Sequence, residues 1–199
     1  MHDVPDEPQM PPDVRAFLED RLKAATCYLE YGTGGSTLLA LRLGVAQVYS
    51  VESDRPFAER VQRAAAKARR PGSNFWLMLA HVGETAEWGR PANTQACRQW
   101  PGYPLQIWYE IERRGHAPDL ILIDGRFRVA CFLACLLKAR PGALIMFDDY
   151  MARAQDYHVV ERHLAPALTI DRCAVFSVPD SVPAAAIALD LARHVVRPE

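Results

Sequence analysis

Short apolar runs alternate with helical patterns along most of the sequence, and this alternation restricts the chain to few architectures. Five runs have this character: residues 26–29, 47–51, 75–80, 120–123 and 143–147. Between them, apolar side chains recur every three or four residues, as at Val129, Phe132 and Leu136. Continuous apolar strands separated by helices are typical of a parallel sheet covered on both faces. The pattern therefore predicts an α/β protein with a doubly wound, mostly parallel sheet and helices on both faces.

The last third of the chain departs from this alternation. After an expected helix over 153–164, residues 167–179 indicate one or two further strands, and 183–196 indicate a closing helix. Residues 84–118, between the third and fourth strands, are rich in proline and aromatic residues, and a helix is expected from 105 to 114. This long connection is a candidate substrate lid.

Length and composition set the class of protein. At 199 residues the chain is expected to form one domain over 13–199, preceded by a flexible arm over 1–12 that holds four prolines and three acids. The net charge of -1 gives no general attraction to nucleic acid or to anionic membranes. No run is long enough to span a bilayer and the start is not a signal peptide, so we expect a cytoplasmic protein. Five cysteines without a CxxC pair are expected to be reduced.

Acids and glycines follow the expected strands, at the edge where ligands bind in sheets of this type. The acids come directly after strands one, two, four and five: Glu30, Glu52, Asp124, Asp148 and Asp149. The glycine-rich stretch "GTGGST" follows Glu30, and Thr37 stands where a GxGxxG dinucleotide motif would have its last glycine. Because Glu30 would repel a pyrophosphate, the loop favours a cationic ligand.

The pattern Glu-x-Gly-x-Gly resembles the first motif of class I S-adenosylmethionine (SAM) dependent methyltransferases, and the resemblance covers roughly residues 13–180. It implies the Rossmann-like form of the doubly wound fold. In that family the acid at the end of the first strand helps to hold the methionine end of SAM, and an acid after the second strand binds the ribose hydroxyls. "HVGET" resembles the family's adenine-side loop. The cofactor-binding residues implied are Glu30, Gly32, Thr33, Gly34, Glu52, Gly83 and Glu84.

"LILIDG" and "PGALIMFDDY" resemble segments of metal-dependent O-methyltransferases of the catechol and macrolide-sugar types. By motif position, the resemblance implies that Asp124, Asp148 and Asp149 hold a magnesium ion. Two carboxylates about 4 Å apart repel by about 4 kcal/mol at an effective dielectric of 20, and a divalent cation relieves this repulsion. The ion would bind substrate hydroxyls and lower the pKa of one, so Asp124 and Asp149 are also candidate catalytic residues. The alternative is that Asp148 or Asp149 only caps the next helix.

The combination predicts a SAM-dependent O-methyltransferase that acts on a small hydroxylated molecule with a divalent metal. No general base is assigned, because Phe127 replaces the lysine of the catechol type and Met151 replaces a histidine of the sugar type. Arg126 and Arg128 either grip an anionic substrate or pair with the acids. A nucleic-acid substrate is disfavoured because no Pro-Pro-aromatic motif follows Asp124. Two alternatives stay open: a SAM-fold protein that binds a ligand or partner without catalysis, and an NAD-dependent oxidoreductase.

Overall fold

The computed structural model describes residues 3–198; residues 1 and 2 of the predicted arm and residue 199 of the predicted domain lie outside the described residues. Within them, seven strands form one sheet in the order β3-β2-β1-β4-β5-β7-β6. The strands are β1 (Cys27–Tyr31), β2 (Gln47–Glu52), β3 (Asn74–Leu79), β4 (Leu120–Ile123), β5 (Leu144–Phe147), β6 (Leu168–Ile170) and β7 (Cys173–Ser177). Strands β1 to β5 pair in parallel, and β7 pairs antiparallel with both β5 and β6. The predicted doubly wound, mostly parallel sheet is confirmed.

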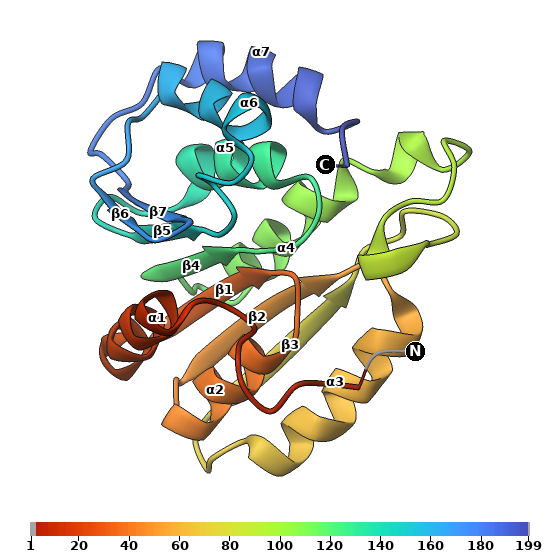
Figure 1. Ribbon diagram of the computed structural model, residues 1–199, viewed down its shortest axis with the longest axis vertical. Helices are drawn as coiled ribbons and strands as arrows, with labels where there is room; N and C mark the ends of the chain where they lie inside the picture. The colour runs from red at the N-terminus through yellow and green to blue at the C-terminus, as the bar shows by residue number, and fades with distance from the viewer. Residues whose placement is uncertain (1–2, 199) are drawn as a thin grey trace.

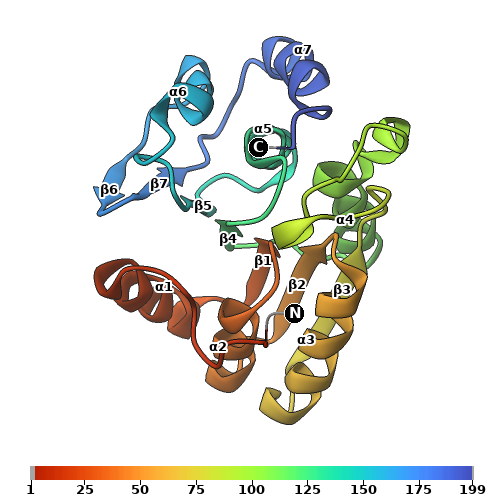
Figure 2. The same cartoon turned by 45° about the vertical axis from the view of Figure 1, so that its right-hand side comes forward.

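Helices cover both faces of the sheet, as the apolar strands require. They are α1 (Pro12–Ala24), α2 (Gly35–Leu43), α3 (Arg55–Ala68), α4 (Gly102–Arg113), α5 (Arg128–Lys138), α6 (Ala154–Tyr157) and α7 (Ala184–His194). Figures 1 and 2 show α1, α2 and α3 on one face and α4, α5 and α7 on the other. Each layer has its own apolar core against the sheet. No helix in the described part of the chain is long and apolar enough to cross a bilayer.

Two expected helices differ from those observed. Helix α4 begins at Gly102 instead of 105, because Pro104 is tolerated in a first turn, where amides have no intrahelical partner. The helix expected over 153–164 divides into α6 and a 3-10 helix, His158–Arg162. Tyr157 at the end of α6 and Val160 in the 3-10 helix are both fully buried, so each of the two short segments contributes a side chain to the core.

Residues 3–11 precede α1 and pass across the start of α2, so that the predicted arm lies against the glycine loop (Figure 1). Pro8 is buried, and Arg42 donates a hydrogen bond to the carbonyl of Asp6. Gly35 lies directly against the carbonyl of Glu7, and a Cβ at this position would collide with it. A glycine is therefore needed where the arm crosses the loop.

Gly35→Ala is expected to displace the arm without unfolding the domain. The substitution should increase the rate of proteolytic cleavage within residues 3–11 several-fold, because the added Cβ occupies the place of the Glu7 carbonyl. Gly102→Ala is the matched control: this glycine also opens a helix, but its added Cβ would be 3.4 Å from the end of the Gln106 side chain. Equal cleavage rates for the two variants would show that the arm does not depend on this contact.

Candidate active site

A cavity of about 910 Å³ lies at the carboxyl ends of β1, β2, β4 and β5. Its wall combines the loop after β1, the strand-end acids Glu52, Asp124 and Asp149, part of the N-terminal arm, and the short 3-10 segment Glu87–Gly89. This is the edge at which a parallel sheet binds ligands, and the volume suits a nucleoside-sized ligand together with a small second molecule.

The loop after β1 approaches the loop after β4 backbone to backbone. Gly32 has φ +94°, and a Cβ there would lie 2.8 Å from both the Cα and the amide nitrogen of Gly125. A Cβ on Gly125 would in turn collide with the Tyr103 hydroxyl, which accepts a hydrogen bond from the Arg126 amide at 3.1 Å. The glycines thus set the distance between the two loops. Gly32, Thr33 and Gly34, all predicted cofactor residues, line the cavity.

Glu30, also a predicted cofactor residue, lies beneath the glycine loop and is fully buried. Four hydroxyl groups donate hydrogen bonds to its carboxylate, from Tyr28, Ser36, Thr37 and Ser50. Burial raises the pKa of Glu30 to about 7, opposed by the bonds from Ser36 and Thr37. The side chain therefore joins β1, β2 and the start of α2 under the loop, and it is outside the cavity wall formed by the described residues.

Glu52 lines the cavity at the end of β2. Its Oε1 accepts hydrogen bonds from the amides of Ser53 (2.6 Å) and Asp54 (2.9 Å), which fix the carboxylate. The Ser53 hydroxyl donates to the carbonyl of Gly89 at 2.7 Å, so part of the predicted lid is fastened over this loop.

The rest of the predicted lid divides between the cavity and the core. The exposed Trp88 and the buried Tyr103 line the cavity, whereas Trp100 lies in the core and donates a hydrogen bond to the carbonyl of Val82. Gly83 (φ +89°) and the exposed Glu84 lie outside the cavity wall formed by the described residues. Their predicted role on the adenine side stays a prediction.

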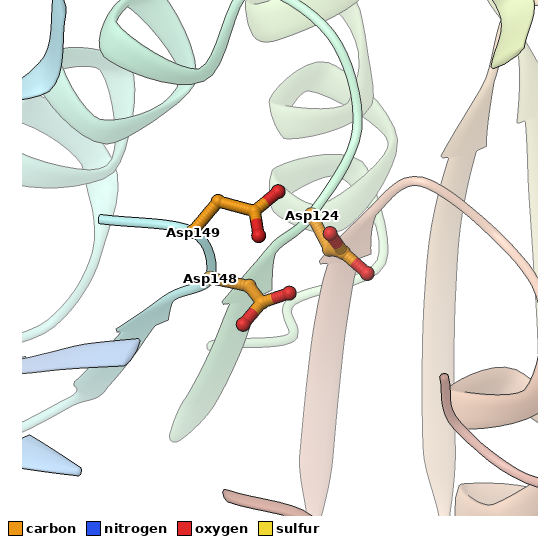
Figure 3. A group of neighbouring side chains, drawn as sticks. All are labelled: Asp124, Asp148 and Asp149. Carbon is orange, nitrogen blue, oxygen red and sulfur yellow. The ribbon is translucent and has the colours of Figure 1, made fainter. Parts of the chain in front are cut away.

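The structure brings Asp124, Asp148 and Asp149 together, with one carboxylate oxygen from each within 4.8 Å of the others (Figure 3). Asp148 is fully buried, while Asp124 and Asp149 are half-buried and line the cavity. Burial raises the pKa of Asp124 to about 7; Arg128 opposes this shift, and Asp148 and Asp149 add to it. Asp149 has φ +55° and Phe127 has φ +52°, so both turns beside the cluster contain a non-glycine residue in the left-handed region.

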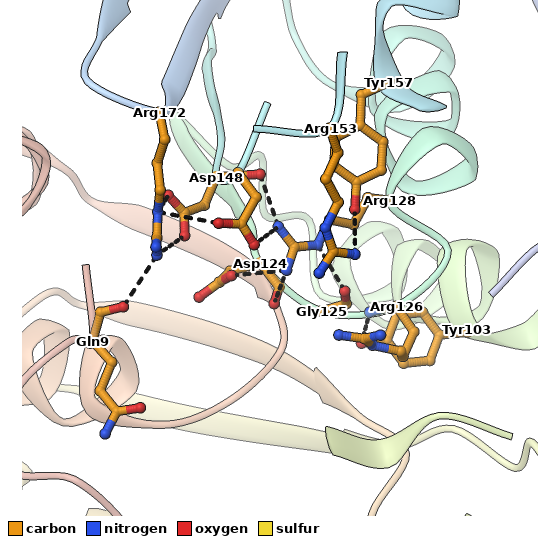
Figure 4. A network of polar contacts seen from close by, with 11 residues as sticks. Gln9, Tyr103, Asp124, Gly125, Arg126, Arg128, Asp148, Arg153, Tyr157 and Arg172 are labelled. Carbon is orange, nitrogen blue, oxygen red and sulfur yellow. Dashed lines mark hydrogen bonds and ion pairs between the residues drawn. The ribbon is translucent and has the colours of Figure 1, made fainter. Parts of the chain in front are cut away.

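Two arginines contact this acidic cluster (Figure 4). Arg128, in the first turn of α5, is buried and forms ion pairs with Asp124 (3.1 Å) and Asp149 (3.2 Å). Arg172, in the turn between β6 and β7, pairs with Asp148 at 2.7 Å and with Asp149 at 3.1 Å. The sequence indicated Arg128 as a possible partner of the acids, but not Arg172, which is far from them in the chain. Asp171, directly before Arg172, was the available signal, since aspartate is one of the residue types that favour turns.

A scan against models of protein families finds no match, and neither does a search of curated proteins. Among solved structures, a methyltransferase-like protein from Silicibacter pomeroyi is 36% identical, with a TM-score of 0.86 over 96% of this chain and 98% of that one. The chain belongs to the class I SAM-dependent methyltransferases. The membership of this family that the sequence predicted is thereby confirmed.

More distant structures share the fold of this methyltransferase. An O-methyltransferase from Bacillus cereus, in complex with S-adenosylhomocysteine (SAH), is 17% identical with a TM-score of 0.57, over 88% of this chain and 84% of that one. The O-methyltransferase TomG from Streptomyces achromogenes, in complex with SAM, is 19% identical with a TM-score of 0.52, over 81% and 76%. At these sequence identities, the two structures show that the fold is shared.

Proposed function

We propose that this methyltransferase binds SAM in the cavity and transfers its methyl group to a hydroxyl oxygen of a small molecule. The observation that carries the proposal is the composition of one continuous cavity. The glycine loop and Glu52 line one part of its wall, and Asp124 and Asp149 line another. A methyl donor and an acceptor bound side by side there would react without a second encounter step.

The glycine loop and Glu52 suit the cofactor. Gly34 lines the cavity with open space where a side chain would stand, and Glu52 is fixed by two amides with its carboxylate at the cavity wall. A carboxylate in this position can accept hydrogen bonds from both ribose hydroxyls. Glu30 would act indirectly, by holding the loop from below through its four hydroxyl partners.

Asp124 and Asp149 suit the acceptor. Both half-buried carboxylates line the cavity and can accept the hydrogen of a substrate hydroxyl. Withdrawing that proton increases the nucleophilicity of the oxygen that attacks the methyl carbon. We therefore assign the orientation of the acceptor hydroxyl to these two side chains.

The predicted magnesium ion fits this arrangement poorly. Three carboxylates are hard oxygen ligands of the kind that Mg²⁺ prefers. Arg172, however, already contacts both carboxylate oxygens of Asp148, and Arg128 pairs with Asp124 and Asp149. An ion would have to displace these guanidinium groups, so no step of the proposed transfer depends on a metal.

Isothermal titration with SAH tests the cofactor site. We expect micromolar binding by the wild type and binding roughly 10- to 100-fold weaker by Glu52→Gln, because the variant loses the charge in its hydrogen bonds to the ribose. Glu59→Gln, an exposed glutamate of α3, is the control and should bind like the wild type. No binding by the wild type would reject the proposal and make NAD the next ligand to titrate.

The transfer itself is tested by measuring the formation of SAH from SAM in the presence of catechols, other phenols and sugars. Formation that depends on one class of acceptor supports O-methylation of that class. SAH binding without SAH formation for any acceptor would favour the alternative that the chain binds a ligand or partner without catalysis.

A further inference from the structure

We infer that Arg128 and Arg172 replace the divalent cation at the acidic cluster, so that this methyltransferase works without a metal. The inference rests on the proposed function for the reaction that the cluster serves. The statement about metal binding itself depends only on the contacts of the two guanidinium groups with Asp124, Asp148 and Asp149.

Arg128 is positioned as a permanent part of the cluster. Its Nε donates to the carbonyl of Gly125 (2.9 Å), Nη1 to that of Asp148 (2.8 Å) and Nη2 to that of Asp124 (3.2 Å). Nη1 also pairs with Asp149, and Nη2 with the carboxylate of Asp124. These contacts equal in number the five N–H donors of a guanidinium group. Arg128 thus connects the loops after β4 and β5, as an ion held by both loops would.

Arg172 completes the neutralisation from the opposite side of the cluster (Figure 4). Its Nε and Nη2 contact the two carboxylate oxygens of Asp148 at 3.0 and 2.7 Å, the bidentate arrangement that a planar guanidinium forms best. Nε also contacts Asp149, and Nη2 donates to the carbonyl of Gln9 in the arm. Asp148 is fully buried, so this pair removes its need for another cation.

Charge leads to the same conclusion. Two guanidinium groups carry together the charge of one divalent ion, and when all three carboxylates are ionised they leave the cluster with a single negative charge. If a divalent metal bound while both arginines stayed in place, the cluster would become positive and like charges would lie together in a partly buried site. The ion and the arginines are therefore alternatives for the same oxygens.

Metal binding by the wild-type protein is the first test, with Mn²⁺ as the probe and electron paramagnetic resonance reporting the free ion. We expect no site with a dissociation constant below about 1 mM, and a melting temperature that 10 mM MgCl₂ leaves unchanged. A sub-millimolar site that Asp148→Asn abolishes would overturn the inference.

Arg172→Ala is the converse test, because removal of this arginine should create a magnesium site. With both oxygens of Asp148 released, 10 mM MgCl₂ should raise the melting temperature of this variant by roughly 3 °C. Addition of Asp148→Asn to Arg172→Ala should remove the gain. Arg193→Ala, which breaks the pair with Asp190 on α7, is the control and should gain no magnesium response. If Arg172→Ala also fails to respond, the arginine is not what keeps the ion out, and the inference is wrong.

The SAH titration repeated with MgCl₂ and with EDTA separates this inference from the proposed function. Equal SAH affinity in both buffers, with no Mn²⁺ site, supports both. Absence of SAH binding rejects the proposed function while the metal measurements still decide the inference. Tighter SAH binding in MgCl₂ than in EDTA, together with a Mn²⁺ site, supports the proposed function and rejects the inference.

Discussion

Replacement of Arg128 by methionine is expected to lower the free energy of unfolding by about 3–5 kcal/mol, because removal of one partner from a buried ion pair leaves its charges uncompensated. Asp124 and Asp149 would each lose an ion pair, and the carbonyls of Gly125 and Asp148 would each lose a donor. Methionine fills a similar volume without a charge, so the loss would report the guanidinium and not a cavity. Urea unfolding measures the effect directly, and the melting temperature should fall by roughly 10 °C.

Arg113→Met is the matched control. Arg113 is an exposed arginine in the last turn of α4, paired with Glu110 at 2.7 Å, and its replacement should leave the unfolding curve unchanged, since surface pairs contribute little. Arg128→Lys should fall between wild type and Arg128→Met, because lysine keeps the charge but lacks the planar fork. Wild-type stability in Arg128→Met would mean that the acidic cluster needs no internal cation.

The type of the central strands and their positions along the chain follow from sequence because most of them are short apolar runs buried on both faces. Strand β1 is buried at all five positions and β4 at all four. A short, continuous apolar run between helical patterns is therefore sufficient to predict such a strand. The division of the helix expected over 153–164 was not predictable in this way, because it depends on which side chains, here Tyr157 and Val160, face the core.

The candidate site was predictable in its chain positions but not in its contacts. Strand-end acids share one edge in any parallel sheet, so the approach of Asp124 to Asp148 and Asp149 follows from topology. Arg172 reaches them only because β7 runs antiparallel beside β5, which places the turn before β7 next to the end of β5. The burial of Glu30 beneath the loop likewise depends on Ser50 of the neighbouring strand. Such contacts between distant segments are set by packing and leave no local signal.

The pH dependence of stability should change when Glu30 is replaced by glutamine. Burial raises the pKa of Glu30 from its ordinary value of 4.5 to about 7 in the folded chain. Between these values the folded state holds a proton that the unfolded state has lost, so the stability that this proton provides is complete below pH 4.5 and is lost as the pH rises through 7. Glutamine does not titrate. The stability of Glu30→Gln relative to wild type should therefore rise by about 3 kcal/mol between pH 4.5 and pH 8.

Urea unfolding of both proteins across this pH range measures the difference, because groups that titrate equally in the two chains cancel. Glu59→Gln, in the exposed face of α3, is the control and should follow the wild-type curve throughout. Parallel curves for Glu30→Gln and wild type would mean that the hydroxyls of Tyr28, Ser36, Thr37 and Ser50 keep the carboxylate ionised despite its burial. If the stability of Glu30→Gln relative to wild type rises with pH, the buried carboxyl group of Glu30 beneath the glycine loop releases its proton near neutral pH.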